Sequence, residues 1–127
     1  MGGEWFEGIP YSALPIDSVD WTHRADHVRE RTIRYGATEF NLEPEWATEA
    51  ALDENRLVGQ GSSATSVEVV GLSVSAPPRG PADPGRVVKV WLVPKDHPPK
   101  GDWWGATACE GNARDRRDYW EEAQPHD

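Results

Sequence analysis

Residues 86–93 limit most strongly what this chain can fold into. The run reads Arg-Val-Val-Lys-Val-Trp-Leu-Val and is apolar at six of its eight positions. A strand that is apolar on both faces is typical of the centre of a covered sheet. Pro94 ends the run, because proline has no N–H to donate to a neighbouring strand. We therefore expect a central strand over residues 86–93, with the rest of the chain arranged around it.

Two further strands are expected from the same kind of pattern. Residues 67–74 alternate in a way that predicts two opposite faces, one with Val70, Leu72 and Val74 and the other with Val69, Gly71 and Ser73. A third strand is expected to begin at Trp103, after a polar, proline-containing loop. Because Trp103 and Trp104 are adjacent, one indole must point away from the core, and we expect the N-terminal arm to cover it.

Helical patterns flank these strands. Apolar residues recur at steps of three or four between Asp20 and Gly36, which predicts an amphipathic helix with Asp20 as its N-cap. Pro44 suits the first position of a second helix over residues 44–53. Asn112 and Asp115 resemble a capping box at the start of a C-terminal helix. We expect its buried stripe to contain Ala113, Trp120 and Ala123.

These patterns together predict an α+β fold with two N-terminal helices, a mainly antiparallel sheet of three or four strands, and a C-terminal helix packed on it. The 127 residues fit one domain. We expect it to span residues 20–123, with an ordered N-terminal arm over 1–19 and a tail over 124–127. The sequence has no apolar run of about 18 residues and no secretory pattern, which predicts a cytoplasmic protein without membrane contact.

The net charge of -9 disfavours binding to a phosphate backbone, which normally needs a positive surface. The charge is nevertheless unevenly distributed. Residues 36–55 contain six acidic and no basic side chains, whereas residues 86–100 contain four basic and one acidic side chain. The basic stretch is either part of a binding face or simply a solvated surface.

Few residues have the spacing of a known catalytic or metal site. His23 and His27 are four apart, a spacing at which two imidazoles can share a metal on a helix, but no third ligand is evident. We therefore expect no metal and no cofactor. Cys109 is the only cysteine, which excludes an intrachain disulfide, and we expect it to be a core thiol. Arg114, Arg116 and Arg117 can either hold a phosphate or form surface salt bridges with their acidic neighbours.

The order of these elements resembles the BrnT-type toxins of bacterial toxin–antitoxin pairs, a branch of the RelE-like small ribonucleases. The resemblance covers roughly residues 20–123. Its pieces are Arg34-Tyr35-Gly36, a short helix with its exit over 46–55, the strands near residues 67, 86 and 103, the step Thr107-Ala108-Cys109, and the helix Arg114-Asp115-Arg116-Arg117-Asp118-Tyr119. Tyr35 stands where the family has a histidine, and Cys109 stands where it has an arginine.

The resemblance implies a metal-independent endoribonuclease in which the RNA 2′-hydroxyl attacks the adjacent phosphate. His27 or Tyr35 would move protons, and Arg34, Arg114 and Arg117 would hold the phosphate. A wider RNA-binding set would comprise Arg31, Arg86, Lys89, Arg116 and Trp104. The expected partners are an RNA substrate, a cognate antitoxin or other protein, and a second copy of the chain.

A second hypothesis comes from a different class of protein. The acidic charge, the two replaced family residues and the seven tryptophans favour a non-catalytic protein-interaction module that keeps the toxin-like fold.

Overall fold

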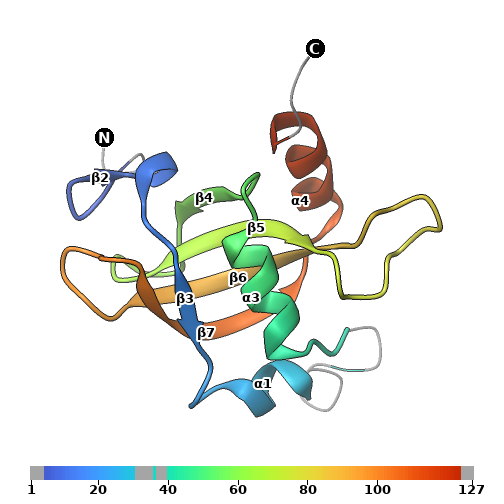
Figure 1. Ribbon diagram of the computed structural model, residues 1–127, viewed down its shortest axis with the longest axis horizontal. Coiled ribbons are helices and arrows are strands. Elements are labelled where there is room, and N and C mark those ends of the chain that lie inside the picture. Colours follow the sequence, from blue (N-terminus) through green and yellow to red (C-terminus); the bar gives the residue numbers. More distant parts are fainter. Residues whose placement is uncertain (1–4, 31–35, 37–39, 124–127) are drawn as a thin grey trace.

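The computed structural model describes residues 5–30, 36 and 40–123, and its centre is a five-stranded mixed sheet (Figure 1). The strands are β3 (Ser18–Asp20), β4 (Leu57–Gln60), β5 (Val67–Ser73), β6 (Arg86–Pro94) and β7 (Asp102–Glu110). Their order across the sheet is β3-β7-β6-β5-β4. β3 runs parallel to β7, and the other neighbours are antiparallel. β6 is therefore the central strand, as the sequence predicts.

One face of this sheet carries the main core. Val67 and Val69 of β5 lie on it beside Val88 and Val90 of β6, and all four are fully buried. Helix α3 (Pro44–Leu52) packs across this face, as predicted for residues 44–53 (Figure 1). The helix lies so close to Gly71 that a Cβ atom there would overlap the Ala50 carbonyl group. A glycine in the strand thus allows the helix to approach the sheet backbone.

The N-terminal segment covers the rest of the same face. It contains a small hairpin of β1 (Trp5–Phe6) and β2 (Ile9–Pro10), followed by the short 3-10 helix η2 (Tyr11–Ala13). Four of its side chains belong to the main core: Phe6, Tyr11, Leu14 and Ile16. The Trp103 indole donates a hydrogen bond of 2.8 Å to the Pro15 carbonyl oxygen, which fixes the segment against β7.

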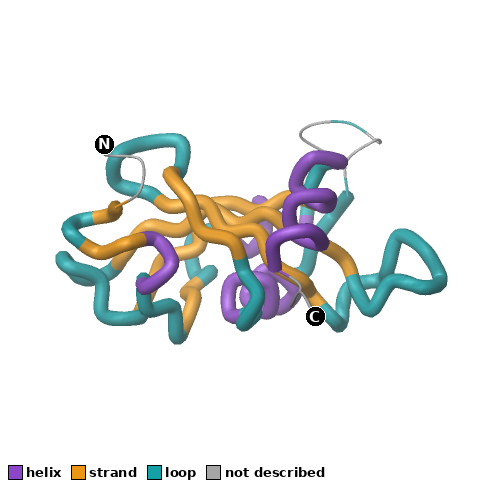
Figure 2. The backbone as a smooth tube through the Cα atoms, turned by 90° about the horizontal axis from the view of Figure 1, so that it is seen from above, coloured by secondary structure: helices purple, strands orange, loops and turns teal. Residues whose placement is uncertain are grey.

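The opposite face of the sheet is covered at one end by the C-terminal helix. Helix α4 (Ala113–Asp118) continues into a π-helical turn, η3 (Tyr119–Ala123). Tyr119 is buried against Val70 and Val87, which makes a second, smaller core. Figure 2 shows the strands as one twisted layer between these packed elements. The predicted capping box is confirmed, since the Asn112 side chain accepts from the Asp115 N–H and the Asp115 side chain accepts from the Asn112 N–H.

The α+β class is confirmed, but several predicted details are wrong. The sheet has five strands rather than three or four, because β3 and β4 add short edges to it. In the predicted stripe of the C-terminal helix, Ala113 is exposed and Trp120 is partly buried, while the side chain of Ala123 lies outside the described part. Tyr119 is the fully buried residue among the described side chains of this helix.

The first predicted helix is also shorter than expected within the described residues. Helix α1 spans only Ala25–Arg29. Asp20 is not its N-cap, because its side chain accepts hydrogen bonds from the N–H and hydroxyl groups of Thr22 and so closes a local turn after β3. The predicted cap is the last residue of β3, and a turn over residues 22–24 stands where the helical pattern predicts the first helical turn.

Candidate functional site

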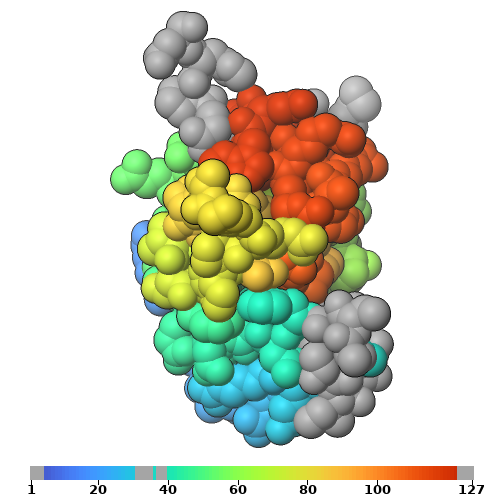
Figure 3. Space-filling model, turned by 90° about the vertical axis from the view of Figure 1, so that its right-hand side faces the viewer, coloured from blue at the N-terminus to red at the C-terminus, as the bar shows by residue number. Residues whose placement is uncertain are grey.

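Those of the predicted ribonuclease-site residues that the structure describes lie in separate regions. His27 is on α1, whereas Arg114, Arg116 and Arg117 are on α4. Figures 1 and 3 place α1 and α4 at opposite ends of the molecule. The described structure therefore does not bring His27 together with these arginines. The other candidates on the first predicted helix, Arg31, Arg34 and Tyr35, lie outside the described residues.

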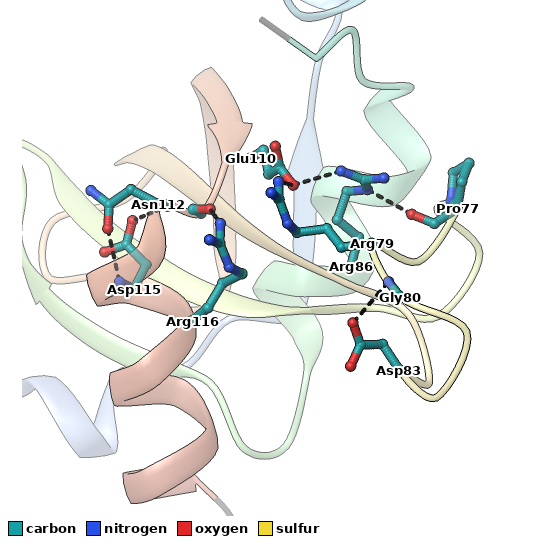
Figure 4. Close-up of polar contacts among 10 residues, drawn as sticks. Pro77, Arg79, Gly80, Asp83, Arg86, Glu110, Asn112, Asp115 and Arg116 are labelled. Carbon is teal, nitrogen blue, oxygen red and sulfur yellow. Dashed lines mark hydrogen bonds and ion pairs between the residues drawn. The ribbon is translucent and has the colours of Figure 1, made fainter. Parts of the chain in front are cut away.

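The arginines of α4 differ in what they contact. The side chains of Arg114 and Arg117 are 81% and 62% exposed and lie 3.8 and 4.0 Å from the Asp118 carboxylate. Such exposed pairs are weak, so both guanidinium groups are accessible. Arg116 instead donates a hydrogen bond of 2.7 Å to the Gly111 carbonyl oxygen, which ties α4 to the end of β7 (Figure 4).

Arg86 of β6 is held by structural contacts. Its Nη1 lies 2.5 Å from a Glu110 carboxylate oxygen, and its Nε donates to the Pro77 carbonyl oxygen at 2.6 Å (Figure 4). Its guanidinium also stacks 3.9 Å above the centre of the Phe40 ring. Arg79 pairs with the same Glu110 oxygen, so the two arginines fix the loop between β5 and β6 against β7.

Lys89 is likewise neutralised by carboxylates. Its ammonium group lies 2.9 Å from Asp115 and 3.6 Å from Glu68, and its side chain is only 15% exposed. Burial acts to lower the pKa of Lys89, but the hydrogen bond and charge of Asp115 outweigh it and raise that pKa above its usual value. The lysine stays charged in the fold, and that charge is balanced within it.

The two adjacent tryptophans of β7 point in opposite directions, as predicted. Trp103 is fully buried and Trp104 is 37% exposed. The N-terminal segment covers Trp103 rather than Trp104, so the expected cover of the outward indole is wrong. Trp104 instead lies between the His23 ring, at 5.5 Å, and the Lys95 ammonium, 4.2 Å from its centroid.

Cys109 is not the core thiol that the sequence predicts. It is half-buried and pairs with Lys89 across the strands, so it lies on the sheet face opposite the main core.

A hollow lies elsewhere, between β3 and α3. This β3–α3 groove is open to solvent, has a volume of about 730 Å³ and is also lined by Ala25 and Arg29 of α1. Its apolar lining comprises Val19, Trp21, Ala25 and Pro44, and its polar lining comprises Ser18, Asp20, Thr22, Arg29, Glu45, Thr48, Glu49 and Lys95. Sequence reasoning missed it because residues 18–20 were assigned to the arm and to a helix cap.

The floor of the groove is fixed by Trp21. Its indole N–H donates a hydrogen bond of 3.0 Å to the Thr48 hydroxyl of α3. The ring lies over Gly105 of β7, where a Cβ atom would overlap it. A tryptophan held from both the helix and the strand gives the groove a preformed apolar surface.

The charges around the groove are mostly paired. Asp20 accepts a hydrogen bond of 2.8 Å from Lys95, and this bond together with those from Thr22 holds the pKa of the Asp20 carboxyl well below its usual range. Arg29 contacts Glu43 at 3.1 Å. Glu45 makes no ion pair or hydrogen bond with the other described residues and is exposed. Among the described residues, the helix side of the groove therefore has a carboxylate without an ion-pair partner, in the first turn of α3.

Comparisons of the chain with protein-family models, with curated proteins and with solved structures find no match. Within residues 5–30, 36 and 40–123, no three His, Cys, Asp or Glu side chains are grouped to hold a metal ion. Helices in that same part of the chain are all too short or too polar to cross a membrane. The chain is thus an α+β protein with a mixed five-stranded sheet, and its function has to be argued from its own surfaces.

Proposed function

We propose that this chain is a non-catalytic protein-interaction module. The observation that carries the proposal is how its positive charges are used. Arg86 and Lys89, the two cations of the central strand, are paired with Glu110, Asp115 and Glu68 rather than presented to a ligand. An open groove with an apolar floor lies beside an edge strand instead. Concave surfaces with an apolar base and a few polar groups are typical binding sites.

The competing hypothesis is an endoribonuclease, and it needs a proton-transfer group beside cations that hold one phosphate. Among the described candidates, Arg114 and Arg117 have accessible guanidinium groups, but His27 lies at the other end of the molecule. The net charge of -9 also opposes the approach of a polyanion. These points favour binding of protein over cleavage of RNA.

Two assays on the purified full chain test this proposal. The first incubates labelled RNA with the chain, with and without ribosomes, and we expect the RNA to remain intact. The second selects binders from a displayed random-peptide library and measures resynthesised peptides by calorimetry, and we expect saturable one-to-one binding.

RNA cleavage by the chain would overturn the proposal if it disappears in a folded Arg114→Ala, Arg117→Ala variant. Lys100→Ala is the matched control, because it also removes an exposed positive charge but lies outside α4. Failure of the library to yield any saturable binder would equally count against an interaction module.

A further inference from the structure

Strand β3 is an edge of the described sheet. Among the described strands it pairs only with β7, through Ser18, Val19 and Asp20. The other side of an edge strand presents backbone N–H and C=O groups that can pair with another chain. In Figure 1, β3 runs beside α3. Residues of both elements line the β3–α3 groove. The groove therefore lies beside a strand whose second edge has no pairing partner among the described residues.

We propose that the β3–α3 groove binds an extended, basic peptide segment that adds to the sheet as a further strand beside β3. This inference rests on the proposed function and names the surface and the class of partner. Strand addition uses the main chain for affinity and alternate side chains for specificity. Because β3 is three residues long, the segment in register with it is about three to five residues long.

The lining of the groove favours alternation of apolar and polar residues in the partner. Successive side chains of a strand point to opposite sides. Those that point toward the floor meet Val19, Trp21 and Ala25. The Trp21 indole is already fixed by Thr48 and Gly105, so little ordering of the groove accompanies binding.

The charge on the helix side favours a basic partner. Glu45 and Glu49 are one turn apart on α3 and both line the groove. Glu49 accepts hydrogen bonds from Ser73 and Ser75, whereas Glu45 has no ion pair or hydrogen bond with any other described residue. Lys95 and Arg29, the two cations of the lining, are each paired with a carboxylate. A lysine or arginine of the peptide can therefore form an ion pair with Glu45. An acidic side chain of the peptide would meet only Lys95 and Arg29, which already form ion pairs.

The test follows the backbone amide resonances of the full chain by nuclear magnetic resonance during titration with synthetic octapeptides blocked at both ends. One peptide alternates Lys with Val, and its control alternates Glu with Val. With the Lys peptide we expect saturable shifts at Val19, Trp21 and Thr48 of the groove. The Glu peptide should leave these resonances unchanged.

A charge-reversal pair of variants tests the electrostatic part. Glu45→Lys is expected to weaken binding of the Lys peptide by about three- to tenfold, the size expected for reversing one exposed charge in contact with a ligand. Glu54→Lys makes the same change at an exposed position outside the groove lining and should change the affinity less than twofold.

Two results would overturn the inference: no binding of the Lys peptide, or shifts that gather around Trp91 and Trp104 and leave β3 unchanged. Either result leaves the proposed function to the library selection and the RNA assay, which report on it separately.

Discussion

Glu49 shows how a single side chain joins two elements. Its carboxylate accepts hydrogen bonds from the Ser73 hydroxyl at 2.7 Å and from the N–H and hydroxyl of Ser75 at 3.0 and 2.6 Å. These contacts tie α3 to the end of β5. Desolvation acts to raise the pKa of Glu49, but the hydrogen bonds from Ser75 and Ser73 outweigh it, so the pKa lies below its usual value.

Glu49→Gln should therefore lower the free energy of unfolding by about 1–2 kcal/mol at neutral pH, because the charged acceptor is lost. A lowered folded-state pKa stabilises the fold above the unfolded pKa of about 4.3, and this contribution disappears as the pH falls through the folded-state value. The difference in Tm between the wild type and Glu49→Gln should then shrink below about pH 4.3. Glu45→Gln is the control, because Glu45 lies on the same helix and makes no hydrogen bond or ion pair with the other described residues. A Tm difference that is independent of pH would contradict this account.

Tyr119 gives a second prediction at this scale. Burial, followed by the hydrogen bond to Asp53, raises the pKa of Tyr119 above its usual range. Tyr119→Phe should cost about 1–2 kcal/mol by leaving the Asp53 carboxylate without this donor. The raised pKa makes the hydroxyl contribute fully below an unfolded pKa of about 10 and less at higher pH. Urea unfolding checks this, with Tyr11→Phe as the control, since the Tyr11 hydroxyl makes no hydrogen bond in the described structure. Equal losses in both variants would show that the Asp53 contact is irrelevant.

At the scale of elements, the sequence predicted the strands whose formation depends on a local pattern of apolar and polar residues. The apolar run of β6 and the alternation of β5 specify their faces because burial on each side selects the residues there. β3 and β4 were missed because strands of three and four residues are too short to show a clear alternation of apolar and polar residues. These segments are strands because they pair with β7 and β5, and such pairing cannot be seen in the local sequence. The β3–α3 groove was missed for the same reason, because β3 forms one of its sides.

Gly105 tests the packing of β7 beneath the groove. Gly105→Ala places a Cβ atom inside the Trp21 indole, so the ring or the strand must shift. We expect a loss of about 1–3 kcal/mol, as in other overpacked cores. Gly59→Ala on β4 is the matched control, because nothing lies within 4 Å of its Cβ position. Urea unfolding measures both, and equal stabilities would mean that Trp21 does not pack on β7 as described.

At the scale of the whole molecule, the basic stretch of residues 86–100 was predicted as a binding face or a solvated surface. The fold uses three of its four cations internally, since Arg86, Lys89 and Lys95 pair with Glu110, Asp115 and Asp20. Two of these partners come from the end of β7 and the start of α4, and the third from β3. The sequence therefore identified the positively charged residues of this stretch. Only the tertiary structure shows which of them form ion pairs with carboxylates from distant parts of the chain.

The measurement that tests the central claim most directly is a side-by-side titration, at several salt concentrations, of labelled single-stranded RNA and of a labelled peptide recovered from the library. We predict that the chain binds the peptide and shows no saturable binding of RNA even at low salt. RNA binding through two or three phosphates would give a slope of log affinity against log salt of about -1.4 to -2.1. Such a slope, flattened by about 0.7 in Arg114→Glu, would contradict the account and return the ribonuclease hypothesis to first place.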